Sequence, residues 1–136
     1  ANYVLPDTAG IWLDGSNDQE RERTQATLKK VAPSGGTSLY QAFSVISSLS
    51  PMPDNVYLLV DSLPTMNKKV PKKYTISSQD RRDYFRKSVS SLPENVPPIN
   101  VILFPMEADP YAPIEYWELA DKTGGSFIQP QKDWPR

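Results

Sequence analysis

The chain has 136 residues, a formal net charge of -1 and neither cysteine nor histidine. The lack of both residue types excludes disulfides, thiolate nucleophiles, histidine general bases and Cys or His metal ligands. Any bound metal must therefore be held by oxygen atoms, which are the ligands that Mg²⁺, Ca²⁺ and Mn²⁺ prefer. The near-neutral charge excludes the basic excess of a nucleic-acid binder, and no apolar run approaches the roughly 20 residues of a membrane span.

The beginning of the chain has the weakest pattern. Residues 3–5 and 11–13 are short apolar runs on either side of a turn, which predicts two short strands. Residues 18–30 are rich in helix-favouring polar side chains and predict a helix with a weak apolar stripe. Because the first residue is Ala1 and not methionine, we expect a processed or truncated start.

From residue 39 onward, helical and strand patterns alternate. Apolar residues at three- and four-residue steps predict helices over 39–49 and 80–92, and a third helix from Pro113 to the stop signal Gly124-Gly125. Continuous apolar runs at 56–60 and 101–104 predict buried strands, and residues 126–128 predict a short last strand. This order predicts one domain over residues 1–136, a three-layer α/β fold with a mostly parallel central sheet and helices on both faces.

Two polar segments fall where such folds bind ligands, at the carboxyl ends of the strands. The first leads into the helix at 39–49 and offers flexible backbone, amide groups and hydroxyls, from Gly35, Gly36, Thr37 and Ser38. The second follows the strand at 56–60 and offers a carboxylate and a hydroxyl that suit a hard cation, from Asp61 and Ser62. Taken singly, the first segment is also typical of an ordinary helix N-cap, and Asp61 of an ordinary turn.

Three segments, in this order, resemble the von Willebrand factor A domain family. They are Gly-Gly-Thr-Ser-Leu-Tyr at 35–40, Val-Tyr-Leu-Leu-Val-Asp-Ser-Leu-Pro at 56–64 and Leu-Ala-Asp-Lys-Thr-Gly-Gly-Ser-Phe at 119–127. The resemblance implies a metal-ion-dependent adhesion site in which Thr37 and Asp61 help to bind Mg²⁺, or Ca²⁺ or Mn²⁺ in its place. It also implies that a carboxylate of a protein partner completes the coordination shell.

The family's first metal-site loop, Asp-x-Ser-x-Ser, is where this sequence departs from the pattern. The nearest counterpart is the segment 14–18, in which Asp14 and Ser16 match and Asp18 replaces the last serine. Too few residues separate Asp14 from Thr37 for the helix and two strands that the family places between these loops. We therefore expect this chain to lack the family's first strand and helix, which leaves strand edges unpaired. Asp14 and Ser16 are kept as further candidate metal ligands.

Two other groups of residues have both a structural and a functional interpretation. We expect the aromatic residues late in the chain to pack in the core rather than form a binding surface; these are Tyr111, Tyr116, Trp117 and Trp134. Glu107 and Asp109 follow the strand at 101–104, and we expect them in a solvated loop, although they could also add acidity near the site.

The resemblance predicts a non-catalytic module that binds a protein partner at a divalent-cation site. Two alternatives stay open: an assembly domain of the same fold without a metal site, and a phosphotransferase with Asp61 as its nucleophile. The enzyme alternative lacks the second acid expected two residues later, where Leu63 stands. Bacterial members of the family often face the periplasm or belong to membrane-associated proteins, which favours such a location here.

Overall fold

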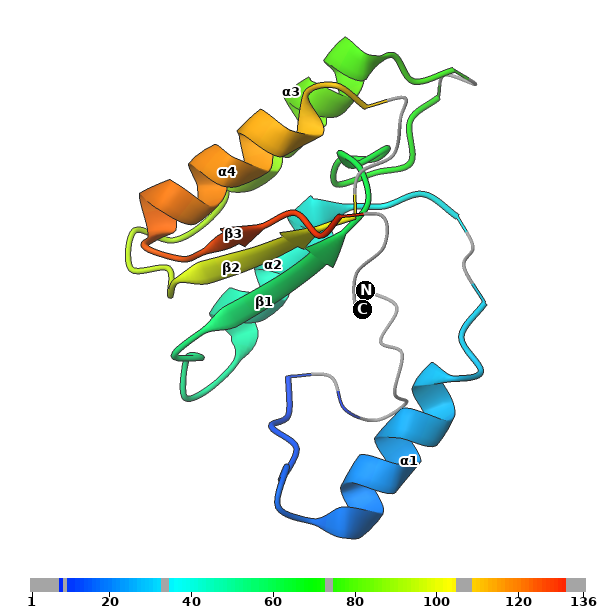
Figure 1. Ribbon diagram of the computed structural model, residues 1–136, viewed down its shortest axis with the longest axis vertical. Coiled ribbons are helices and arrows are strands. Elements are labelled where there is room, and N and C mark those ends of the chain that lie inside the picture. Colours follow the sequence, from blue (N-terminus) through cyan, green and yellow to red (C-terminus); the bar gives the residue numbers. More distant parts are fainter. Residues whose placement is uncertain (1–7, 9, 33–34, 73–74, 105–108, 132–136) are drawn as a thin grey trace.

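A computed structural model describes residues 8, 10–32, 35–72, 75–104 and 109–131. Its elements are, in chain order, α1 (Asp18–Leu28), α2 (Leu39–Ser48), β1 (Val56–Val60), α3 (Ser78–Val89), β2 (Ile99–Leu103), α4 (Ala112–Thr123) and β3 (Phe127–Ile128) (Figure 1). The predicted alternation of helices and strands after residue 39 is confirmed, with element ends that differ by a few residues.

The three strands form an all-parallel sheet in the order β1-β2-β3. β1 and β2 pair along their full lengths, from Val56 opposite Ile99 to Val60 opposite Leu103. Helices α3 and α4 make the two connections, because neighbouring parallel strands need a long crossover between them. The predicted α/β fold with a parallel sheet is confirmed.

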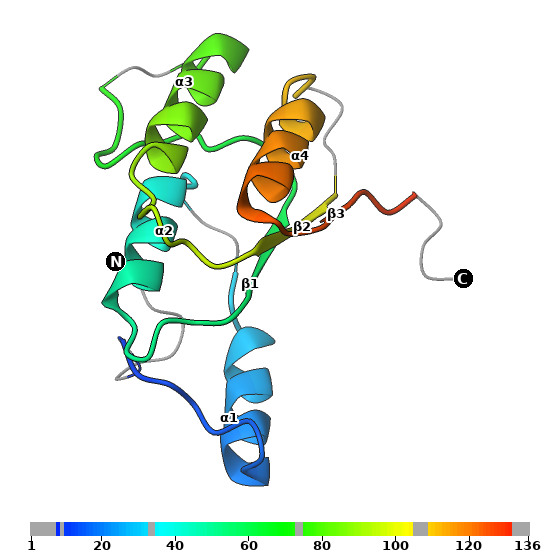
Figure 2. The same ribbon diagram turned by 90° about the vertical axis from the view of Figure 1, so that its left-hand side faces the viewer.

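Helices α2, α3 and α4 lie on the same face of the sheet (Figure 2). α4 packs on β2 and β3, and α3 packs against both α2 and α4. Because parallel crossovers are almost always right-handed, a sheet whose strands follow chain order carries its connecting helices on one face. The core between these helices and the sheet is formed by Leu39, Phe43, Ile46, Leu63, Phe85, Ile99, Val101, Leu103, Ala112, Tyr116, Leu119 and Ala120.

No helix of the described residues covers the opposite face of the sheet. On this face Tyr57 and Leu59 of β1 are 70% and 64% exposed, and Ile128 of β3 is 54% exposed. We expected helices on both faces because the strand at 56–60 is apolar throughout, a composition typical of strands buried on two sides. The remaining helix, α1, packs against none of the other elements, so the described structure has two layers where three were expected.

Helix α1 lies below the sheet in Figure 1, apart from the core. The Asn17 side chain caps its N-terminus by accepting two backbone hydrogen bonds, and none of its described residues is buried. The segment before α1 is joined to the rest of the molecule by a hydrogen bond from Trp12 Nε1 to Pro51 O (2.9 Å). Residues 11–13 are exposed and form no strand, so that prediction is wrong; the strand predicted over 3–5 lies outside the described residues.

Local sequence sets the ends of the helices that build the core. Ser77 and Asp80 form a capping box at the start of α3, in which each side chain accepts a hydrogen bond from the other residue's backbone N–H. Helix α4 has Pro113 in its first turn and ends at Gly124, whose φ of 71° is left-handed. In the part of the chain that the structure describes, none of the helices has the length and apolar character needed to cross a bilayer.

Candidate functional site at the carboxyl end of β1

Two loops meet beside the carboxyl end of β1. One leads into α2 (residues 35–38), and the other follows β1 (residues 61–67). Thr37 O accepts hydrogen bonds from the backbone N–H groups of Thr65 and Met66 (3.1 and 3.0 Å), and Thr37 N–H donates to Thr65 Oγ1 (3.0 Å). The two segments predicted to contain the site are therefore held side by side by main-chain hydrogen bonds.

Ser38 and Gly36 tighten the junction between these loops. Ser38 Oγ donates to Asn67 O (2.7 Å) and also caps the N-terminus of α2. A Cβ at Gly36 would lie 2.7 Å from Thr65 Oγ1 and 2.8 Å from Met66 Cγ. Any larger residue at this position would therefore force the side chains of Thr65 and Met66 to move.

Replacing Gly36 with alanine is expected to destabilise the protein by about 1–2 kcal/mol, as overpacking commonly does, because the new Cβ pushes Thr65 away from Thr37. Urea unfolding measures the loss, and amide hydrogen exchange should become faster at Thr65 and Met66, which donate to Thr37 O. Gly35→Ala is the matched control. Gly35 has a φ of 73°, and no atom lies within 4 Å of an added Cβ, so this substitution adds backbone strain without crowding. Equally fast exchange at Thr65 in both variants would contradict the explanation.

Asp61 and Ser62 begin the loop that follows β1. The exposed Asp61 carboxylate accepts a hydrogen bond from the Ser62 hydroxyl (3.0 Å). Ser62 O accepts a hydrogen bond from the hydroxyl of Tyr116 in α4 (2.9 Å). Burial raises the pKa of Tyr116, and the nearby carboxylates of Asp109 and Asp61 raise it further. The Tyr116 hydroxyl therefore stays a neutral donor that fixes this loop to α4.

Asp109 is a buried member of the same region. We expected it in a solvated loop, and that prediction is wrong, because the residue is 3% exposed. Its Oδ2 accepts hydrogen bonds from Leu63 N–H (2.7 Å) and Arg81 Nη1 (3.2 Å). Its Oδ1, like that of Asn67, is buried without a hydrogen-bond partner in the described part of the chain. The only feature of the sequence that indicated a role for Asp109 was its position after a strand, at the edge of the sheet where such folds bind ligands. Glu107 lies outside the described residues.

Asp14 and Ser16 lie elsewhere in the molecule. They form a turn just before α1, in which Ser16 N–H and Ser16 Oγ both donate to Asp14 Oδ1 (2.9 and 2.6 Å). Both hydrogen bonds lower the pKa of Asp14, and the bond from the Ser16 hydroxyl has the larger effect. The hydrogen bond between Trp12 and Pro51 ties this segment to the loop that enters β1 at its amino end. The described structure does not bring Asp14 and Ser16 together with the two loops at the carboxyl end.

Two buried carboxylates join α3 to α4 and to the segment that precedes α4. Asp109 pairs with Arg81, and Glu115, which is 3% exposed, accepts hydrogen bonds from Arg82 Nε and from Arg86 Nη2 (2.9 Å). Burial alone would raise the pKa of Glu115, but the hydrogen bonds and charges of Arg82 and Arg86 outweigh burial and lower it. These ion pairs attach α3 to α4, which carries Tyr116, and to the residue just before α4, Asp109; both residues reach the loop after β1.

The aromatic residues late in the chain differ in their burial. Tyr116 is fully buried and packs edge-on against Phe85, with ring centroids 5.0 Å apart, as expected of a core residue. Tyr111 packs against the core while partly exposed. Trp117 is 50% exposed, so its prediction as a core residue is wrong, and Trp134 lies outside the described residues.

Comparisons of the chain with family models, with curated proteins and with solved structures found no match. Among the residues that the structure describes, no three acidic side chains gather closely enough to hold a metal ion together. The loops at the carboxyl end of β1 instead combine hydroxyl, amide and carboxylate oxygens. Such hard donors suit Mg²⁺ or Ca²⁺ and groups that form hydrogen bonds.

Proposed function

We propose that the chain is a non-catalytic protein-interaction module that binds a divalent cation at the carboxyl end of β1 and, through it, an acidic side chain of a protein partner. The observation that carries the proposal is the set of hydrogen bonds between Thr37 and residues 65–66, which hold the two loops together. These loops contain two of the segments that resemble the von Willebrand factor A family, in which the corresponding threonine and aspartate help to bind Mg²⁺. Sequence resemblance and loop geometry thus support the same edge of the sheet.

The oxygen atoms around these loops fit a hard cation. Asp61 offers an exposed carboxylate and Thr37 a hydroxyl, and Mg²⁺ accepts both kinds of ligand. The Oδ1 atoms of Asn67 and Asp109 are buried without a hydrogen-bond partner among the described residues, and such atoms are usually satisfied by a water or an ion. Because the described residues of these loops offer one exposed carboxylate, we expect weak binding that leaves water on the metal and a position for the partner's carboxylate.

Replacing Asp61 with alanine is expected to weaken Mg²⁺ binding by roughly tenfold or more, because the variant loses the exposed carboxylate of the site. Calorimetric titration of the full chain with MgCl₂ gives the affinity, and NMR shifts at Thr37 and Thr65 locate the ion. Asp54→Ala is the matched control, since Asp54 is an exposed aspartate before the opposite end of β1. Equal losses in the two variants, or shifts confined to residues outside the two loops, would rule out this site.

The open face of the sheet favours one alternative, an assembly domain that works without a cation. Tyr57 and Leu59 expose apolar surface there, which in soluble proteins often marks an interaction surface. A folded chain that shows no Mg²⁺-dependent shifts in the same titration would support this alternative over the cation site. The phosphotransferase alternative has no comparable support, because Leu63, at the place of its second acid, is fully buried.

A further inference from the structure

β1 is the outermost strand of the sheet, and no strand of the described residues pairs with its free edge. Val56 N–H and Val60 O form hydrogen bonds with the residues that flank β2 (2.9 and 2.8 Å), so both residues direct their backbone groups toward β2. The direction of these groups alternates along a parallel strand. The N–H and C=O groups of Tyr57 and Leu59 therefore point to the free edge.

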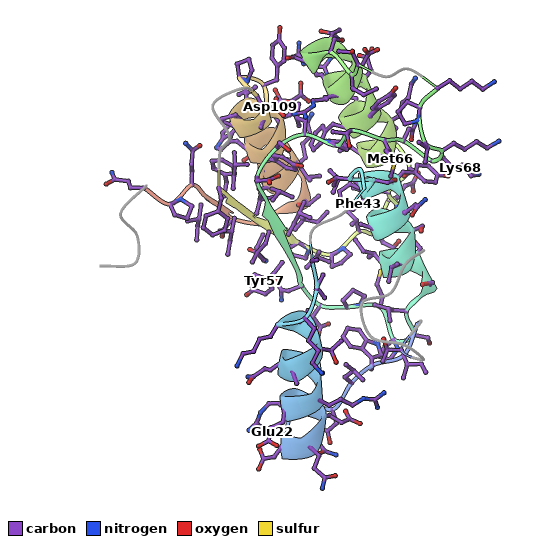
Figure 3. The ribbon with its side chains drawn as sticks, turned by 90° about the vertical axis from the view of Figure 1, so that its right-hand side faces the viewer. Glu22, Phe43, Tyr57, Met66, Lys68 and Asp109 are labelled. Atoms are coloured by element: carbon purple, nitrogen blue, oxygen red, sulfur yellow. The ribbon has the colours of Figure 1, made fainter. Side chains whose placement is uncertain are left out.

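The same two residues expose their side chains on the open face of the sheet. Figure 3 shows Tyr57 pointing away from α2, which carries Phe43, on the opposite side of the sheet. Ile102 lies opposite Leu59, and Ile128, which is 54% exposed, lies opposite Ile102, so these residues extend the apolar surface across the sheet. Natural edge strands are commonly protected by lysine, proline or a bulge. The β1 sequence, Val-Tyr-Leu-Leu-Val, has no charged residue and no proline, so its edge is open to pairing.

We propose that the free edge of β1 binds an extended segment of another protein, which adds a fourth strand to the sheet. The backbone of this segment pairs with the edge-facing groups of Tyr57 and Leu59, and its alternate apolar side chains lie against their side chains. The interaction uses the edge and the open face of the sheet, and it does not require the cation proposed for the loops.

The charges at the ends of β1 define the chemistry of the bound segment. Asp54 precedes the strand and Asp61 follows it, and both are exposed. If two copies of β1 paired antiparallel about Leu58, Asp61 of each copy would lie opposite Asn55 of the other and next to its Asp54, and these neighbouring like charges disfavour self-association. A segment with lysine or arginine at its ends meets opposite charge instead. The occupant is therefore a strand of alternating apolar residues with basic ends.

The test uses the full chain, without Mg²⁺, and the peptide acetyl-Lys-Val-Thr-Ile-Thr-Val-Lys-amide. Amide hydrogen exchange followed by NMR reports on the edge directly. Saturating peptide is expected to slow exchange at Tyr57 and Leu59 by about tenfold or more, because their N–H groups gain acceptors, and to change Leu58 and Val60 little. A peptide with glutamate at both ends is expected to bind about tenfold more weakly, and added salt should reduce this difference.

Leu59→Lys is expected to abolish the protection, because a lysine on an edge strand opposes pairing. Ile128→Lys is the matched control: it makes the same change on the same face at β3, away from the free edge of β1, and should keep the protection at Tyr57. Unchanged exchange at Tyr57 and Leu59 with saturating peptide overturns the proposal, and so does equal protection in the two lysine variants. Protection that rises with protein concentration in the absence of peptide also overturns it, because the occupant is then a second copy of the chain.

Discussion

Replacing Gly125 with alanine is expected to destabilise the fold by about 3 kcal/mol, in the upper part of the range for overpacked sites. A Cβ at this position would lie 2.1 Å from Ile99 O and 2.4 Å from Ile99 C. These backbone atoms begin the middle strand of the sheet, so they cannot move aside without disturbing its pairing with β1 and β3. Equilibrium unfolding in urea, followed by circular dichroism, measures the change in the free energy of unfolding.

Gly124→Ala is the matched control for this prediction. Gly124 has a φ of 71°, and no atom lies within 4 Å of an added Cβ. Its replacement therefore adds the strain of a left-handed backbone, about 1 kcal/mol, without a steric clash. If Gly124→Ala lowers the free energy of unfolding as much as Gly125→Ala does, contact with Ile99 is not the reason that glycine is required at residue 125.

Replacing Arg82 and Arg86 together with methionine is expected to cost about 2–3 kcal/mol near pH 7, because the Glu115 carboxylate loses both hydrogen-bonding partners. Removing one partner of a buried ion pair commonly costs about 3–5 kcal/mol. We expect less here because the Arg82 and Arg86 side chains are 29% and 54% exposed, so that water can approach the carboxylate. Methionine keeps much of the apolar contact that an arginine side chain makes, and urea unfolding near pH 7 measures the loss.

The pH dependence of this loss identifies its cause. In the native chain the pKa of Glu115 is lowered, so its contribution to stability is present above the ordinary glutamate value of about 4.3 and is lost as the pH falls through the lowered value. In the variant, Glu115 is buried without a partner, and burial raises its pKa. Protonation of Glu115 on acidification therefore stabilises the folded variant. The difference in the free energy of unfolding between the two proteins should therefore shrink on acidification.

A difference that stays constant between about pH 7 and pH 4 would contradict the role given to Glu115. Arg21→Met provides the control. Arg21 forms an ion pair with Asp18 on the surface of α1, where the two side chains are 53% and 79% exposed. Exposed pairs of this kind contribute little to stability, so this variant should unfold much as the native chain does.

The elements of the core could be predicted from the sequence because their signals are local. The strand predicted over 56–60 is found with the same bounds, since an apolar run between turn residues is sufficient to define it. The third predicted helix ends at Gly124 as expected, because glycine adopts the left-handed conformation at that position. Helix α3 begins at Ser78, before the predicted residue 80, because Ser77 caps a first turn that contains few apolar residues.

The candidate site could be predicted only in part. The composition of the two loops and their resemblance to the family made Thr37 and Asp61 candidates, but the loops meet through hydrogen bonds between residues 28 positions apart in the chain. Asp109 was expected in solvent because it is a carboxylate in a loop that follows a strand. It is buried because it accepts hydrogen bonds from Leu63 and Arg81, which are 46 and 28 positions away. No local pattern records such distant partners.

The sequence by itself determined the order of helices and strands from residue 39 onward, the parallel α/β class and the restriction of metal chemistry to oxygen ligands. Only the tertiary structure decided that the helices share one face, that β1 has a free edge and that Asp109 is buried while Asp14 lies far from the loops. The physical reason is that hydrophobic periodicity records which side chains avoid water. Which partner covers those side chains depends on how the chain crosses over the sheet and on contacts between residues far apart in the sequence.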